Sequence, residues 1–117
     1  MALHADRECV INTQGYTGTT ITSNCFVSAL GQPTNAGCGI EGSNGSFGAQ
    51  FNRLQGGVYA VEWGKEDVKI WFFTRACIPS EIINNSQLDP QSWGIPTARF
   101  SGDCSVPSTL GPQRLVS

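Results

Sequence analysis

The sequence is poor in the patterns that mark helical, membrane-bound or nucleic-acid-binding proteins. No long window repeats apolar residues at helical spacing, and no apolar run approaches the roughly 20 residues that a membrane helix needs. Charge is also sparse, because 7 Lys and Arg stand against 9 Asp and Glu, which gives a net charge of −2. The basic residues are scattered, whereas a nucleic-acid-binding surface needs them gathered in a patch or stripe. We therefore expect neither a membrane nor a nucleic acid as a partner.

What the sequence does contain favours short strands joined by turns. Its 117 residues include 14 Gly and 6 Pro, and these residues punctuate strands and loops. The length fits one domain, which would bury somewhat under about 70% of the surface that its unfolded chain exposes. The predicted fold class is all-β.

Local patterns predict few regular elements on either side of residues 58–74. Residues 1–4 are predicted to form a short strand. The glycine-rich segment 14–52 is expected to consist of loops with few regular elements. The stretch "IPSEIINNSQLDPQSWGIP", residues 78–96, has Pro near both ends, so it is expected to be a crossing loop with at most one helical turn near residues 80–83.

The stretch "VYAVEWGKEDVKIWFF" predicts a β-hairpin, with strands at residues 58–63 and 68–74. Alternation along the first strand places Glu62 on the face opposite Tyr59 and Trp63. The hairpin combines carboxylates with large aromatic side chains, so it either belongs to the active surface of a carbohydrate enzyme or packs over the hydrophobic core. The stretch alone does not decide between them.

The five cysteines indicate a disulfide-bonded, extracellular protein. They form none of the C-x-x-C pairs of zinc or redox sites, and His4 is the chain's one histidine, so we expect no metal site and no cofactor. The N-terminal stretch "MALHADREC" has neither the basic start nor the apolar core of a secretory signal, so no signal peptide is expected in this chain. The cysteines and the N-terminus therefore point to different compartments. The five are Cys9, Cys25, Cys38, Cys77 and Cys104, and their pairing cannot be read from their spacing.

Stretches spread over nearly the whole chain resemble one family. In order they are "MALH", a cysteine-rich loop ending in "NAGCGI", "SFGAQFNRLQGGVYAVEW", "VKIWFFTR", "IPSEI", "DPQSWGIPTARF" and "GDC". They resemble the C-terminal half of fungal endo-β-1,3(4)-glucanases of glycoside hydrolase family 16. That family consists of secreted β-jelly-roll sandwiches with a β-glucan chain on the concave face. The resemblance implies a partial jelly roll of the concanavalin A-like lectin and glucanase type, with residues 1–117 as a fragment of one domain, truncated at both ends.

The resemblance also implies a catalytic strand of the form Glu-x-Asp-x-x-Glu, whose two catalytic carboxyl groups lie about 5–5.5 Å apart in a retaining enzyme. None of the 9 acidic residues of this chain forms that pattern. In the family the motif lies just before the stretch similar to "MALH", so we expect it roughly 10–20 codons upstream of Met1. The chain as written is then inactive. An acid–base pair of Glu62 and Glu66 is an alternative, although a solvated strand face and a turn explain both residues without it.

The resemblance implies two contacts to a β-glucan substrate. The histidine of the "LH" step, His4, resembles a cleft residue beside the acid/base carboxylate, and Trp63 could stack on a sugar ring or pack in the sandwich. Among the cysteines, Cys77 has no usual counterpart in the family, and Cys104 is expected to lose its partner. The alternatives to a fragment of a hydrolase are a non-catalytic β-glucan-binding remnant and a product with no function of its own.

Overall fold

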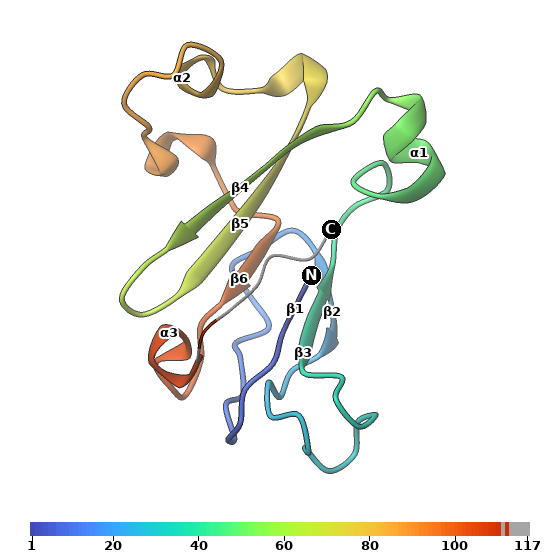
Figure 1. The fold of residues 1–117 in the computed structure, drawn as a ribbon, viewed down its shortest axis with the longest axis vertical. Helices are drawn as coiled ribbons and strands as arrows, with labels where there is room; N and C mark the ends of the chain where they lie inside the picture. Colours follow the sequence, from blue (N-terminus) through green and yellow to red (C-terminus); the bar gives the residue numbers. More distant parts are fainter. Residues whose placement is uncertain (111, 113–117) are drawn as a thin grey trace.

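The computed structural model describes residues 1–110 and 112, and strands dominate its regular structure (Figure 1). The first sheet has three antiparallel strands in the order β1-β3-β2. Its strands are β1 (Ala2–Leu3), β2 (Thr19–Thr22) and β3 (Cys38–Glu41). Two of them fall in the segment 14–52, which the sequence predicted to be mainly loop. The Thr-Thr-Ile-Thr run of β2 is rich in β-branched residues, and that composition is the local signal for a strand.

The second sheet is also three-stranded and antiparallel, in the order β4-β5-β6. Its strands are β4 (Gly57–Trp63), β5 (Val68–Thr74) and β6 (Ala98–Phe100). Strands β4 and β5 form the hairpin that the sequence predicted, and every residue of β4 pairs with one of β5. Strand β4 lies at one edge of the sheet.

Short helical segments lie between and after the strands. Helix α2 occupies Ser80–Ile83, where the sequence predicted a helical turn, but the crossing segment also contains η2 (Pro90–Trp93), so the expectation of at most one turn is wrong. None of the helices among the described residues is long and apolar enough to cross a bilayer. The other helical segments are α1 (Gly48–Arg53), η1 (Arg75–Cys77), η2 (Pro90–Trp93) and α3 (Val106–Thr109).

Both sheets contribute to one apolar core. Ile40 of β3 and Phe100 of β6 are fully buried in the same cluster, together with Val68 of β5. Antiparallel strands alternate their side chains between faces, so the β4-β5-β6 sheet turns one face to this core. The core is completed by Ala5, Cys9, Ile11, Cys25, Cys38, Ala98 and Val106.

The crossing segment 78–96 covers the opposite face of the β4-β5-β6 sheet. Trp93 packs edge-to-face against Trp71 and Phe73 of β5, with ring centroids 5.3 and 5.6 Å apart. The indole N–H of Trp71 donates to the Gly94 carbonyl at 3.1 Å. Trp71 is thus a buried scaffold residue, with 4% of its surface exposed.

Two disulfides join distant parts of the chain. Cys25 pairs with Cys38, and Cys9 pairs with Cys104 across 95 residues of sequence. The expectation that Cys104 loses its partner is therefore wrong, because backbone pairing between Ile11 and Gly102 brings the two segments together. Cys77 is exposed and is the free cysteine of the described part of the chain.

Candidate functional site

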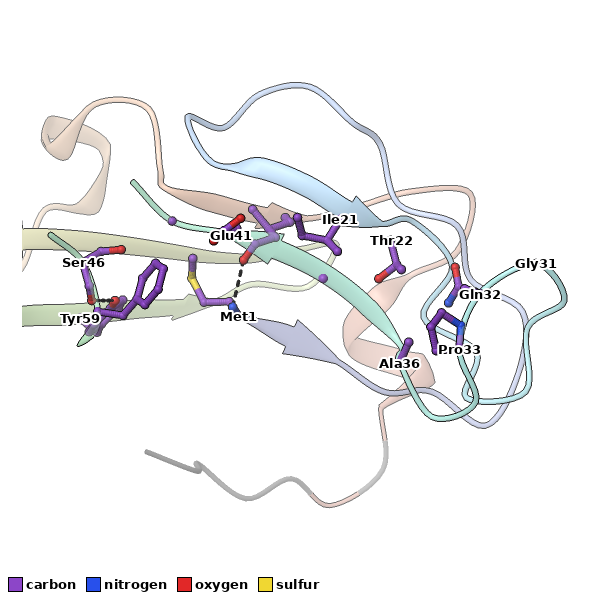
Figure 2. A pocket seen from close by; sticks show the side chains of 14 residues that line it. Met1, Ile21, Thr22, Gly31, Gln32, Pro33, Ala36, Glu41, Ser46 and Tyr59 are labelled. Atoms are coloured by element: carbon purple, nitrogen blue, oxygen red, sulfur yellow. Dashed lines mark hydrogen bonds between the residues drawn. The ribbon is translucent and has the colours of Figure 1, made fainter. Parts of the chain in front are cut away.

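An open groove of about 720 Å³ runs along one face of the β1-β3-β2 sheet (Figure 2). The side chains of β2 and the end of β3 line its middle, the loop 31–36 lines one end, and Tyr59 lies at the other. Gly39 of β3 carries no side chain, so the strand's backbone is open to the groove. The lining residues are Met1, Ile21, Thr22, Gly31, Gln32, Pro33, Ala36, Gly39, Ile40, Glu41, Gly42, Ser46, Phe47 and Tyr59.

The loop end of the groove is held in place by hydrogen bonds that meet at one carbonyl. The Gly37 carbonyl accepts from the Thr22 hydroxyl at 2.7 Å and from the Gln32 side-chain amide at 3.0 Å. The same amide nitrogen of Gln32 donates to the Asn24 carbonyl at 2.7 Å. The Cys25–Cys38 disulfide anchors the strand that follows Gly37. This end of the groove is therefore organised without a ligand.

The opposite end connects the two sheets. The Tyr59 hydroxyl of β4 donates to the backbone carbonyl of Ser46, and the Ser46 hydroxyl donates to the Ser43 carbonyl at 2.6 Å. Ser46 is buried, whereas Phe47 beside it is 54% exposed. An exposed aromatic ring at the rim of a groove lined by both apolar and polar groups suits a ligand that has both apolar faces and hydroxyl groups, as a sugar does.

His4 lies just after β1 with an exposed side chain, outside the lining of this groove. Its Nε2 is 3.0 Å from the Asn35 carbonyl oxygen. A carbonyl can only accept, so this contact requires the proton on Nε2 and leaves Nδ1 as an acceptor when the ring is neutral. Asn35 has a φ of +62°, a conformation that Asn tolerates better than most residues.

Trp63 ends β4 and is 51% exposed, beside Val61 at 52% and Tyr59 at 44% on the same face of the strand. Trp63 pairs with buried Val68 of β5, and paired residues lie on the same face of a sheet. The three side chains therefore lie on the core-facing side of the sheet, at its β4 edge. Trp63 ends β4 of one sheet, whereas His4 follows β1 of the other, and no hydrogen bond among the described residues joins them. Trp63 is thus available for stacking, but away from the groove lining.

Of the three acidic residues of the hairpin, two form ion pairs and the third is exposed in the turn. Glu62 lies opposite Lys69 across the strands, and its carboxylate is 3.3 Å from the Lys69 ammonium. Glu66 is exposed in the turn before β5. Buried Asp67 accepts from Arg99 of β6 at 2.8 Å. Glu62 therefore already forms an ion pair across the hairpin, which favours a scaffold role.

Sequence reasoning missed the groove, and the two substrate contacts that it predicted, His4 and Trp63, lie outside the groove lining. Thr22, Gln32, Glu41 and Tyr59 come from four separate parts of the chain, and nothing in their spacing indicates that they meet. The usable local signal was the β-branched run of β2, which marks a strand inside the segment expected to be loop. Possible metal ligands gather at Cys9, Asp103 and Cys104, but the two sulfurs are joined in a disulfide and are not free thiolates.

The fold is that of a two-sheet, all-β protein with an open groove on its β1-β3-β2 sheet. The family model described as "XgeA-like, catalytic GH16 domain" matches residues 1–117, so the chain belongs to glycoside hydrolase family 16. An endo-1,3(4)-β-glucanase of Arthroderma benhamiae is 42% identical over 98% of this chain and 26% of its own length. The chain thus spans about a quarter of that relative.

Solved structures agree in fold. An elongating family 16 β-1,3-glucosyltransferase superimposes with a TM-score of 0.85 at 38% identity, covering 96% of this chain and 36% of the other. Laminarinase 16A of Phanerochaete chrysosporium, solved with β-glucans in both donor and acceptor sites, has a TM-score of 0.82 at 33% identity, covering 95% and 38%. The predicted all-β class of jelly-roll type is thereby confirmed.

Proposed function

We propose that residues 1–117 correspond to the C-terminal half of a single family 16 domain and supply β-glucan-binding surface. The observation that supports this most directly is the groove, which combines hydroxyl, amide and carboxylate groups with the aromatic rings of Phe47 and Tyr59. Ligand sites of this kind pair apolar surface with a few placed polar groups. The laminarinase of similar fold binds β-glucan at two sites, and the same polymer class is the ligand proposed here.

Catalysis by this chain alone is not part of the proposal. Its sequence contains no Glu-x-Asp-x-x-Glu, so nothing supplies the paired nucleophile and proton donor of a retaining glycosidase. Glu62, the acid considered above as one of an alternative acid–base pair, forms an ion pair with Lys69. The parent domain would be a retaining endo-β-1,3(4)-glucanase, and the two disulfides fit the oxidising, extracellular surroundings of such an enzyme.

His4 and Trp63 are proposed as additional contacts with the polymer. His4 offers an exposed ring whose Nε2 is held by the Asn35 carbonyl, so that its Nδ1 can accept from a sugar hydroxyl. Trp63 offers a half-exposed ring, and a flat aromatic face fits the C–H face of a pyranose. Each contact extends the surface beyond the groove itself.

Retention on insoluble polymer tests the binding proposal. The purified chain is incubated with β-1,3-glucan and, as a matched polymer, with cellulose, and the bound fraction is measured. We expect retention on the β-1,3-glucan, and a loss of roughly two- to tenfold in affinity for Trp63→Ala and for His4→Ala. Leu88→Ala, at an exposed apolar residue of the crossing segment, is the control and should bind as the unchanged chain does. Absence of retention would overturn the proposed function.

A reducing-sugar assay tests the catalytic part. The chain should release no more sugar from β-1,3-glucan or mixed-linkage glucan than Glu62→Gln does, because covalent catalysis and proton transfer both need carboxylates that it lacks. Turnover that is abolished in Glu62→Gln would overturn this part of the proposal and leave the binding result standing.

A further inference from the structure

The side-chain donors of the groove are all engaged within the protein. Four lining residues carry side-chain N–H or O–H groups, namely Thr22, Gln32, Ser46 and Tyr59. Each hydroxyl has one proton, and each of the three donates it to a backbone carbonyl. The Gln32 amide has two, and it donates to the carbonyls of Asn24 and Gly37. These side chains have no proton left to donate to a ligand.

Acceptors, in contrast, remain available. The hydroxyl oxygens of Thr22 and Tyr59, whose side chains are not buried, keep lone pairs after donating their protons, whereas Ser46 is buried. Glu41 ends β3 with an exposed side chain that lines the groove (Figure 2). Its carboxylate forms no hydrogen bond or ion pair with the described residues. The groove therefore presents acceptor oxygens and one free negative charge.

These two properties determine which ligands the groove favours. A neutral sugar unit carries several hydroxyl groups, each of which can donate, and a hydroxyl that donates to a carboxylate forms a charge-assisted bond. A ligand carboxylate or sulfate has no proton to donate and is repelled by a like charge. Building on the proposed function, we infer that the groove selects neutral, hydroxyl-rich glucan chains over anionic ones and that Glu41 is the residue that discriminates.

Two soluble probes measure the selectivity, a neutral β-1,3-glucan oligosaccharide and its carboxymethylated form. The unchanged chain should bind the neutral probe more tightly. Glu41→Gln keeps an acceptor oxygen but removes the charge, so it should raise the anionic-to-neutral affinity ratio roughly two- to fivefold at low salt, the effect of one exposed charge. At about 1 M salt, where the Debye length is about 3 Å, the increase should disappear.

Glu66→Gln is the matched control, because Glu66 is an exposed acid of the β4-β5 turn and its loss changes the net charge by the same amount. It should leave the ratio within about 1.5-fold of the unchanged chain, since its charge lies outside the groove lining. Equal ratios for Glu41→Gln and Glu66→Gln, or tighter binding of the carboxymethylated probe by the unchanged chain, would overturn the role of Glu41 and leave the proposed function intact. Binding of neither probe would overturn both.

Discussion

The indole N–H of Trp93 donates to Oε1 of Glu81 at 2.6 Å, and this bond ties the two ends of the crossing segment to each other. The same Trp93 ring packs edge-to-face against Trp71 and Phe73 of β5. Glu81 is the second residue of α2. The hydrogen bond therefore couples the position of α2 to the covered face of the β4-β5-β6 sheet.

This contact makes the crossing segment sensitive to acid. The Trp93 hydrogen bond, followed by backbone N–H groups, holds the pKa of the Glu81 carboxyl below its ordinary value of 4.5. A group whose pKa is lowered on folding contributes stability above its unfolded pKa and loses that contribution as pH falls through the folded one. We expect the Trp93 indole N–H resonance to shift as the pH falls below 4.5. Glu81→Gln should abolish the shift and Glu66→Gln should preserve it; titration at or above 4.5 in the unchanged chain would contradict the assignment.

Trp71 and Trp63 should differ in their importance for stability. Trp71 is 4% exposed and Trp63 is 51% exposed. Truncation of a buried aromatic removes packing and leaves a cavity, so Trp71→Ala should lower the free energy of unfolding by about 3–5 kcal/mol. Trp63→Ala should change it by less than about 1 kcal/mol. Urea denaturation of both variants measures the difference, and similar losses would mean that Trp63 is covered in solution.

The Cys9–Cys104 disulfide should be a main source of stability. It joins residues 95 positions apart, and removal of a native disulfide from a small domain costs about 2–5 kcal/mol. Cys9→Ser/Cys104→Ser should therefore unfold at lower denaturant concentration than the unchanged chain. Cys77→Ser, at the exposed free cysteine, is the control and should leave the midpoint unchanged. Equal midpoints for all three proteins would show that the pairing does not form.

The apolar strip of β4 should promote self-association. Tyr59, Val61 and Trp63 are exposed side by side, and β4 is an edge strand among the described residues, a combination that templates pairing with another chain. Val61→Lys should reduce concentration-dependent association measured by sedimentation velocity, since a lysine on an edge strand opposes pairing. Ser28→Lys, at an exposed residue outside this sheet, adds the same charge and should not. A monomeric unchanged chain at high concentration would refute the prediction.

The ring of His4 should adopt a single neutral tautomer. The Asn35 carbonyl requires a proton on Nε2, and the chain has one histidine, so its nitrogen resonances need no assignment. We expect the ¹⁵N shifts of the neutral ring to be those of the Nε2–H form. Asn35→Gly keeps the carbonyl and suits the φ of +62°, so the tautomer should persist. Asn35→Val should mix the two forms, because a β-branched residue is strained at that φ; identical spectra for both variants would remove Asn35 as the positioning group.

Local patterns in the sequence were sufficient for the elements whose contacts are local. Two strand-like runs joined by a turn predicted β4 and β5, and the Pro-bounded segment 78–96 was expected to hold a helical turn near residues 80–83, where α2 lies. The absence of helical periodicity predicted the all-β class. Each of these depends on residues a few positions apart, for which backbone propensity and turn chemistry are the dominant influences.

The groove and the disulfide pairing were decided only by the tertiary structure. Thr22, Glu41 and Tyr59 line one surface because β3 pairs with both β1 and β2 and because the Tyr59 hydroxyl reaches the Ser46 carbonyl. Cys104 meets Cys9 because residues near 102 pair with residues near 11. The two-residue alternation along a strand shows which side chains lie on the same face, but it does not show which part of the chain packs against that face. The sequence by itself therefore determined the class and the hairpin, whereas long-range packing, which depends on the whole chain at once, decided which side chains line the groove.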